Sequence, residues 1–231
     1  MTGTSAPEDP TNGARRSAPA SIGILGGTFN PPHLGHLALA ASAREGLGLG
    51  EVWLVPARTS PFKLGDQDPG PEHRLAMCRL AAARAPGLSV CPLELERSGP
   101  SYTVDTLRAI HASHPHSELT FIVGADTAAT MPSWKEPLEL LELAGLAVAA
   151  RAGASRREVR ATLEDLVSPT QEGPARLGLS FLDMEKVAIS SSLARDRAAR
   201  GEPIEDLVGV PVARYIAEHD LYAQATAGRA A

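Results

Sequence analysis

The chain has 231 residues, of which 43% are hydrophobic, and this is enough apolar material for a globular core of ordinary size. Its 22 Lys and Arg against 27 Asp and Glu give a formal net charge of -5, which excludes the broad positive field that non-specific nucleic-acid binding requires. The two cysteines, Cys78 and Cys91, form no Cys-x-x-Cys pair, which excludes a disulfide scaffold and a zinc ribbon.

The two ends of the chain differ in composition from the middle. Residues 1–20 are rich in Ser, Thr, Pro and Gly, which predicts a disordered N-terminal tail, and 224–231 are expected to form a disordered C-terminal tail. One domain is then expected over 21–223. No apolar run reaches the roughly 20 residues that span a bilayer, and the N-terminus has no apolar signal-peptide core. We therefore expect a cytoplasmic protein with no membrane partner and no nucleic-acid partner.

From Ser21 onward, short apolar runs alternate with helical stretches, as in the βαβ units of a parallel sheet. Strands are predicted at 22–25, 52–55, 88–93, 119–123, 146–150 and 179–182, with another near Val187. Helices are predicted at 34–47, 72–85, 102–111, after Asp126, 137–143 and 155–166, followed by two more, the last at 212–221. The predicted fold is α/β: a Rossmann-like doubly wound parallel sheet with a C-terminal helical segment, and a ligand at the carboxyl ends of its strands.

The first loop carries the strongest signal. Gly26 and Gly27 follow the first strand, and two adjacent glycines let the backbone approach a ligand while the next helix offers free N–H groups to an anion. The spacing is not the Gly-x-Gly-x-x-Gly of dehydrogenases, and the second strand ends in Pro56 where those enzymes need a ribose-binding acid. His33 and His36 lie one helical turn apart, so both imidazoles are expected to face one phosphate.

A second anion site is predicted at Ser190–Ser192, directly before a helical segment that contains Arg195. Its hydroxyl and N–H groups suit an N-cap and a phosphate nest, and the arginine adds a charged fork one turn later. An ordinary helix cap would explain one of the serines but not three together with the arginine.

These two segments carry a resemblance to a known family. GGTFNPPHLGHL at 26–37 resembles the His-x-Gly-His motif of the nucleotidyltransferase superfamily, and SSSLAR at 190–195 resembles its second signature. Segments 55–63, 73–77, 99–107, 121–126 and 132–134 occur between them in the order found in bacterial nicotinate-nucleotide adenylyltransferases. The resemblance covers about residues 21–223.

The resemblance implies transfer of AMP from ATP to nicotinate mononucleotide, which gives nicotinate adenine dinucleotide and pyrophosphate in NAD biosynthesis. It implies catalytic roles for His33, His36 and Arg195. The implied ATP-binding residues are Gly26, Gly27, Thr28, Phe29, His33, His36, Lys63, Gly124, Asp126, Ser190, Ser191 and Arg195. The residues implied to bind nicotinate mononucleotide are Thr28, Thr103, Trp134 and Arg151.

The chemistry of these side chains suits the implied roles. Asp126 follows a buried strand, where it is placed to accept hydrogen bonds from ribose or to cap the next helix. The Trp134 ring suits stacking on pyridine, and the helix that starts near Thr103 offers N–H groups to a carboxylate. The acceptor phosphate has a second pKa of about 6 and needs no general base. We expect Mg²⁺ to be held mainly by ATP phosphate oxygens and water, with no metal ligands from the protein.

Two positions depart from the family pattern, because Phe62 stands where a histidine is frequent and Lys135 where an aromatic is common. Selectivity for nicotinate over nicotinamide mononucleotide is therefore open.

Rival interpretations are phosphopantetheine as acceptor, an aminoacyl-tRNA synthetase and a non-catalytic nucleotide-binding regulator. The aromatic platform argues against the first, and the short acidic chain against the second. The joint presence of His33, His36 and Arg195 argues against the third. The sequence leaves a homo-oligomer open.

Overall fold

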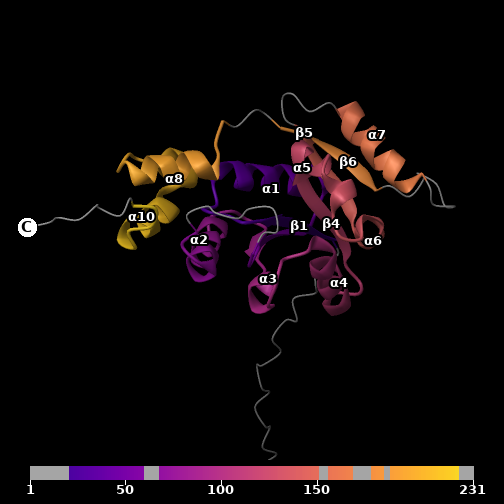
Figure 1. Ribbon diagram of the computed structural model, residues 1–231, viewed down its shortest axis with the longest axis horizontal. Helices are drawn as coiled ribbons and strands as arrows, with labels where there is room; N and C mark the ends of the chain where they lie inside the picture. The colour runs from indigo at the N-terminus through magenta and orange to yellow at the C-terminus, as the bar shows by residue number, and fades with distance from the viewer. Residues whose placement is uncertain (1–20, 60–67, 151–155, 169–177, 185–187, 224–231) are drawn as a thin grey trace, which may run out of the picture.

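The computed structural model describes residues 21–59, 68–150, 156–168, 178–184 and 188–223. Within them, one parallel sheet has the strand order β3-β2-β1-β4-β5-β6 (Figure 1). The strands are β1 (Ser21–Gly27), β2 (Glu51–Pro56), β3 (Leu88–Val90), β4 (Glu118–Gly124), β5 (Gly145–Ala150) and β6 (Leu179–Asp183). This order confirms the predicted Rossmann-like doubly wound α/β fold.

Helices connect these strands and extend beyond the last one. They are α1 (Leu34–Leu47), α2 (Pro71–Ala82), α3 (Leu93–Glu96), α4 (Thr103–Ser113), α5 (Ala125–Ala128), α6 (Pro137–Leu143), α7 (Arg156–Val167), α8 (Ser191–Ala199), α9 (Glu205–Val208) and α10 (Val210–Glu218), with a 3₁₀ turn η1 (Met131–Ser133). No helix in the described ranges is both long and apolar enough to cross a membrane.

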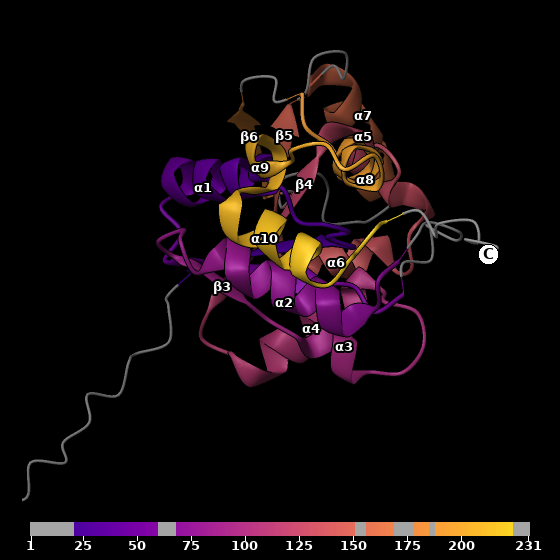
Figure 2. The ribbon, with the colours of Figure 1, turned by 90° about the vertical axis from the view of Figure 1, so that its left-hand side faces the viewer.

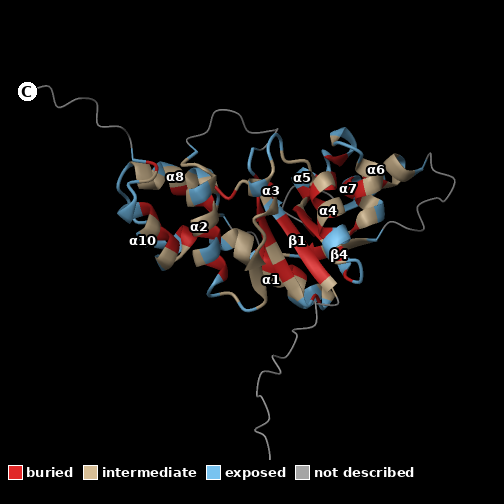
Figure 3. Cartoon of the chain, turned by 90° about the horizontal axis from the view of Figure 1, so that it is seen from below, coloured by how far each residue is buried: buried red, intermediate tan, exposed pale blue. Residues whose placement is uncertain are grey.

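The core lies on both faces of the sheet, because successive side chains of a strand point to opposite faces. Ile22 and Ile24 of β1 belong to a buried cluster with residues of α4, α5, α6 and α7, whereas Leu25 belongs to one with residues of α1 and α2. Figure 3 shows the buried strands at the centre and exposed residues on the outer helices. Cys78 and Cys91 are free thiols, and burial raises the pKa of Cys78 to about 12.

A third buried cluster joins the C-terminal helices to α2. Met77 and Ala81 of α2 pack with residues of α8, α9 and α10, among them Val212 and Ile216. Figures 1 and 2 both show α10 lying against α2, and Figure 1 shows α7 on the opposite side of the molecule. The predicted C-terminal helical segment is thus present, and it completes the core at this end of the molecule.

The structure corrects several predicted boundaries. The third strand ends at Val90 rather than at residue 93, because Pro92 has no N–H for the ladder and opens α3 instead. The helix predicted to end at Ala85 ends at Ala82, before Pro86 restricts the preceding backbone. Among the described residues after β6 there are three helices rather than two, because Gly209, with a φ of 81°, separates α9 from α10. The strand predicted near Val187 lies outside the described residues.

The sheet parts where the strand order reverses. β1 and β4 pair only as far as Ile24 and Phe121, although each strand continues for three more residues. On its other side β1 stays paired to β2 up to Gly27 and Pro56, and β4 stays paired to β5 up to Gly124. The carboxyl ends of the two central strands therefore diverge, which is where open α/β sheets bind their ligands.

Candidate active site

The β1–α1 loop brings the two predicted histidines into direct contact. His33 is the N-cap of α1: the His36 backbone N–H donates to its Nδ1 at 3.3 Å, and the His33 N–H donates to Nδ1 of His36 at 3.2 Å. The two rings stack with centroids 3.6 Å apart at an interplanar angle of 19°. The sequence predicted two imidazoles facing one ligand, and the structure places them side by side at a helix N-terminus.

This capping arrangement selects a tautomer for each ring. A neutral imidazole whose Nδ1 accepts a hydrogen bond carries its hydrogen on Nε2. His33 and His36 are thereby set as Nε2–H donors, next to the positive end of the α1 dipole. Two parallel donors beside a helix N-terminus are suited to an anion that bears several oxygens.

The rest of this loop packs tightly under the histidines. The Phe29 ring lies edge-on to the His36 ring with centroids 4.9 Å apart, and Phe29 adopts a positive φ of 51°. A Cβ at Gly27 would lie 3.2 to 3.4 Å from three atoms of that ring, so this position has little room for a side chain. Gly26 is exposed, Thr28 is half-buried, and the Gly27 carbonyl accepts from the Ala57 N–H at 2.9 Å.

The second predicted anion site lies against this loop, although it is about 160 residues away in sequence. Ser190 caps α8 by accepting from the Leu193 N–H at 3.1 Å. Ser191 Oγ donates to the Pro31 carbonyl at 2.9 Å, and Arg195 Nη1 donates to the Asn30 carbonyl at 2.8 Å. The structure thus brings His33, His36, Ser190, Ser191 and Arg195 to one end of the sheet. It also gives Ser191 and Arg195 a structural task, which is to hold the loop.

Arg74 is a candidate that the sequence reasoning missed. Its side chain is fully buried, and its guanidinium donates to the carbonyls of Thr28 at 2.8 Å, Ala57 at 2.6 Å and Arg58 at 3.0 Å. Its Nε also lies 3.0 Å from the Asp68 carboxylate. One arginine therefore fastens the loop after β1 to the loop after β2.

A signal for Arg74 is present in the sequence. Arg74 shares a stripe with Met77, Cys78, Ala81 and Ala82, spaced as i, i+3, i+4, i+7 and i+8 along α2, and all five are buried. An arginine on an otherwise apolar stripe predicts a buried guanidinium with internal partners, because an unpaired buried charge is very costly.

Two of the predicted acceptor residues, Thr103 and Trp134, lie on elements that follow β3 and β4. Thr103 is the first residue of α4, and its N-cap Tyr102 makes no side-chain capping bond. Trp134 is the C-cap of η1, donates from Nε1 to Thr130 Oγ1 at 3.1 Å and lies edge-on to Phe121 with centroids 6.0 Å apart. Lys135 lies 3.0 Å from both carboxylate oxygens of Asp105 and 5.1 Å from the centre of the Tyr102 ring.

The remaining predicted residues divide into two groups. Gly124 ends β4, and the exposed Asp126 follows in the first turn of α5, so both lie where β1 and β4 part. Lys63 and Arg151 lie outside the described residues.

The loop after β2 is also bound to Ser101, near the start of α4. The Ser101 hydroxyl accepts from the Arg58 N–H at 3.0 Å, and its own N–H donates to the Thr59 carbonyl at 3.1 Å. The loop that Arg74 holds is therefore also attached to the entrance of α4.

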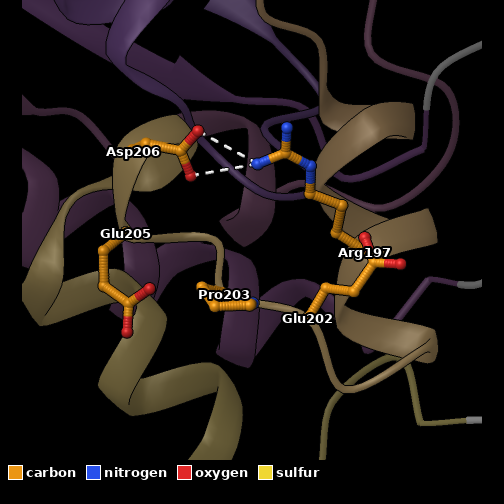
Figure 4. Close-up of a pocket in the computed structure, with 5 residues that line it drawn as sticks. All are labelled: Arg197, Glu202, Pro203, Glu205 and Asp206. Atoms are coloured by element: carbon orange, nitrogen blue, oxygen red, sulfur yellow. Dashed lines mark hydrogen bonds and ion pairs between the residues drawn. The ribbon is translucent and has the colours of Figure 1, made fainter.

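A surface hollow elsewhere has the wrong charge for a nucleotide. It measures about 560 Å³ and is lined by Arg197, Glu202, Pro203, Glu205 and Asp206 (Figure 4). Arg197 Nη1 lies 3.0 and 3.2 Å from the Asp206 carboxylate oxygens, so its charge is already offset.

Across the described part of the chain, no group of three or more His, Cys, Asp or Glu side chains is arranged to hold a metal ion.

Comparison with known proteins gives one consistent family. Residues 24–197 match the family described as cytidylyltransferase-like. A relative from Symbiobacterium thermophilum, "Probable nicotinate-nucleotide adenylyltransferase", is 42% identical over 203 residues, which cover 88% of this chain and 95% of the relative. A relative of the same name from Geobacillus thermodenitrificans is 39% identical over 205 residues, which cover 89% of this chain and 87% of the relative.

Solved structures agree at the level of fold. A Plasmodium falciparum nicotinic acid mononucleotide adenylyltransferase complexed with APC has a TM-score of 0.70 at 20% identity, over 88% of this chain and 97% of its own. The same enzyme complexed with NaAD has a TM-score of 0.69 at 21% identity, over 87% and 97%. The chain therefore belongs to the cytidylyltransferase-like family, among the nicotinate-nucleotide adenylyltransferases.

Proposed function

We propose that this chain transfers AMP from ATP to nicotinate mononucleotide, forming nicotinate adenine dinucleotide and pyrophosphate. The observation that carries the proposal is the stacked His33–His36 pair, held in the Nε2–H tautomer at the mouth of the parted β1 and β4 strands. Relatives about 40% identical bear the name of this activity. A phosphate oxygen of the acceptor attacks the α-phosphorus of ATP, a new P–O bond forms, and the bond to the β-phosphate breaks.

The charge that develops at phosphorus accounts for the donors on the ATP side. His33 and His36 donate from Nε2 to oxygens of the triphosphate, and the stabilisation grows as negative charge moves onto them. The N-terminus of α8 and Arg195 receive the β- and γ-phosphates, with Ser190 and Ser191 acting there as cap and loop anchor. We call residues 26–36, from the end of β1 to the start of α1, the phosphate loop. Gly26, Gly27, Thr28 and Phe29 form its floor, and Lys63 adds a cation.

The acceptor occupies the half of the site that begins at α4. Its pyridine ring stacks on Trp134, and its carboxylate meets the N–H groups that open α4 at Thr103. Thr28 and Arg151 bind its phosphate, and Gly124 with Asp126 receives the ribose of ATP. Catalysis is then mainly positioning and electrostatics, since the acceptor phosphate is largely ionised without a general base.

Mg²⁺ fits this site as a companion of the triphosphate. The donors described around the loop are imidazole, hydroxyl, N–H and guanidinium groups, which suit phosphate oxygens better than a bare divalent cation. When bound with the triphosphate, this ion would supply positive charge that offsets the charge on the leaving pyrophosphate. We propose the cytoplasm as the location of the reaction.

Pyrophosphate release tests the proposal directly. Purified protein is incubated with ATP, Mg²⁺ and one acceptor at a time: nicotinate mononucleotide, nicotinamide mononucleotide or phosphopantetheine. We expect the highest kcat/KM with nicotinate mononucleotide. Faster turnover of either other acceptor would reassign the substrate, and no release with any of them would refute an adenylyltransferase.

A further inference from the structure

The C-terminal part of the chain reaches back to the phosphate loop through Tyr222. Its hydroxyl donates to Oδ1 of Asn30 at 2.6 Å, which joins two residues 192 positions apart. This contact is separate from α8, whose Arg195 and Ser191 hold the carbonyls of Asn30 and Pro31. Two segments from the C-terminal part of the chain, α8 and the turn that contains Tyr222, therefore hold the loop at Asn30 and Pro31.

The Tyr222–Asn30 bond is enclosed. Tyr222 is 7% exposed and Asn30 4% exposed. Burial raises the pKa of the Tyr222 phenol above its ordinary value, so its hydroxyl keeps the hydrogen that it donates throughout the neutral range. Tyr222 has a φ of 66°, a conformation that bulky residues rarely adopt, and its packing in the cluster around Ile216 maintains it.

A displacement of Asn30 would be transmitted to the histidines. Two prolines, Pro31 and Pro32, separate Asn30 from His33, and each proline ring fixes φ. A segment with so little backbone freedom passes a shift on instead of absorbing it. His33 in turn sets His36 through their two reciprocal hydrogen bonds.

We propose that Tyr222 is a positioning residue for adenylyl transfer: its hydroxyl fixes Asn30 and thereby sets where His33 and His36 present their Nε2 hydrogens. This inference rests on the proposed function. Small displacements of a catalytic group slow the chemical step more than they weaken ground-state binding, because the transition state demands the stricter geometry. The loss of this hydroxyl should therefore appear mainly in kcat.

The chain offers a matched control nearby, in the helix that precedes the turn of Tyr222. Tyr215 of α10 also makes a side-chain hydrogen bond, with its hydroxyl 2.9 Å from Nδ1 of His73, but its partner does not belong to the phosphate loop. Tyr222→Phe and Tyr215→Phe each delete one hydroxyl and keep the ring in place. Steady-state kinetics of pyrophosphate release are measured well below the melting temperature of each variant, and Tm is measured by circular dichroism.

We expect kcat of Tyr222→Phe to fall about tenfold with KM for the acceptor within about twofold of wild type, and Tyr215→Phe to retain wild-type kinetics. If Tyr222→Phe lowers Tm but keeps wild-type kcat, the residue is merely structural and the proposal is wrong. If wild type itself releases no pyrophosphate, the proposed function fails, which is a different result.

A second variant approaches the same bond from the other side. Asn30→Ala removes the acceptor, and the double variant with Tyr222→Phe should lower kcat no further than the more affected single variant, because both changes break one interaction. Additive losses in kcat would show that the two residues act independently and would overturn the proposal. If Tyr222→Phe is poorly folded, Asn30→Ala alone tests the same bond, because it keeps the phenol: its kcat should fall, and a wild-type kcat would overturn the proposal.

Discussion

His33 combines an observed structural role with a proposed catalytic one in a single imidazole. Its Nδ1 caps α1 and its ring stacks on His36, so the atom that stabilises the helix also fixes which nitrogen carries the hydrogen. A simple deletion of this side chain would remove both contributions at once. The two can be separated because asparagine is a good N-cap but has no imidazole.

We therefore expect His33→Asn and His33→Ala to differ in stability but not in activity. His33→Ala should lose about 1 kcal/mol of unfolding free energy with the cap, and His33→Asn very little. Both should lose about 100-fold or more in kcat, as should His36→Ala, because each removes a transition-state donor. Urea unfolding and pyrophosphate release measure the two effects. Near-wild-type kcat in His36→Ala would contradict the assigned role.

Arg74 shows how one buried side chain can organise two loops. Its planar guanidinium serves three carbonyls and a carboxylate, and a lysine ammonium cannot match that fork. We expect Arg74→Lys to reduce the unfolding free energy by about 1 to 3 kcal/mol and to raise KM for both ATP and the acceptor. The control is Arg79→Lys, at an exposed position of the same helix, which should be neutral in both measurements. Equal KM values in the two variants would show that Arg74 does not position the site.

At the scale of elements, a charge network ties α4 to α6 beside the proposed acceptor half of the site. Arg108 of α4 pairs with Glu136 and Glu139 and, at 2.9 Å, with Asp105. Asp105 is also paired with Lys135. The hydrogen bond from Arg108 holds the pKa of Glu139 below its ordinary value of 4.5. These side chains are partly exposed, so solvent and salt screen the contribution.

The direction of this pKa shift fixes the pH dependence of the contact. A carboxylate whose pKa is lowered by folding stabilises the protein at pH values above its pKa in the unfolded chain. This contribution is lost as the pH falls through its lower pKa in the folded protein. We expect the Tm difference between wild type and Arg108→Gln to be small and positive at about pH 6, and to shrink by about pH 3. Arg214→Gln, at an exposed arginine of α10, should show no such trend. A Tm difference that grows on acidification would contradict this assignment.

At the scale of the whole molecule, much of the architecture could be predicted from local patterns. The alternation of apolar strands with helices predicted the parallel doubly wound sheet, because a parallel pair needs a crossover. Errors occurred at ends, where single residues decide: Pro92 stopped β3, and Gly209 divided the last helical stretch. The proximity of His33 to His36 was predictable because they lie three residues apart at a helix start, whereas their reciprocal capping bonds appear only in the structure, where His33 is an extended N-cap.

The sequence by itself determined the fold class, the family and the loop that carries His33 and His36, since each is encoded by residues close together along the chain. Only the tertiary structure decided how that loop is held, because its supports come from α2, α8 and the turn after α10. Arg74 and Tyr222 act through contacts that span 46 and 192 residues, and no local period encodes such distances. Burial is the physical reason they matter, because polar groups withdrawn from water must find their partners inside the protein.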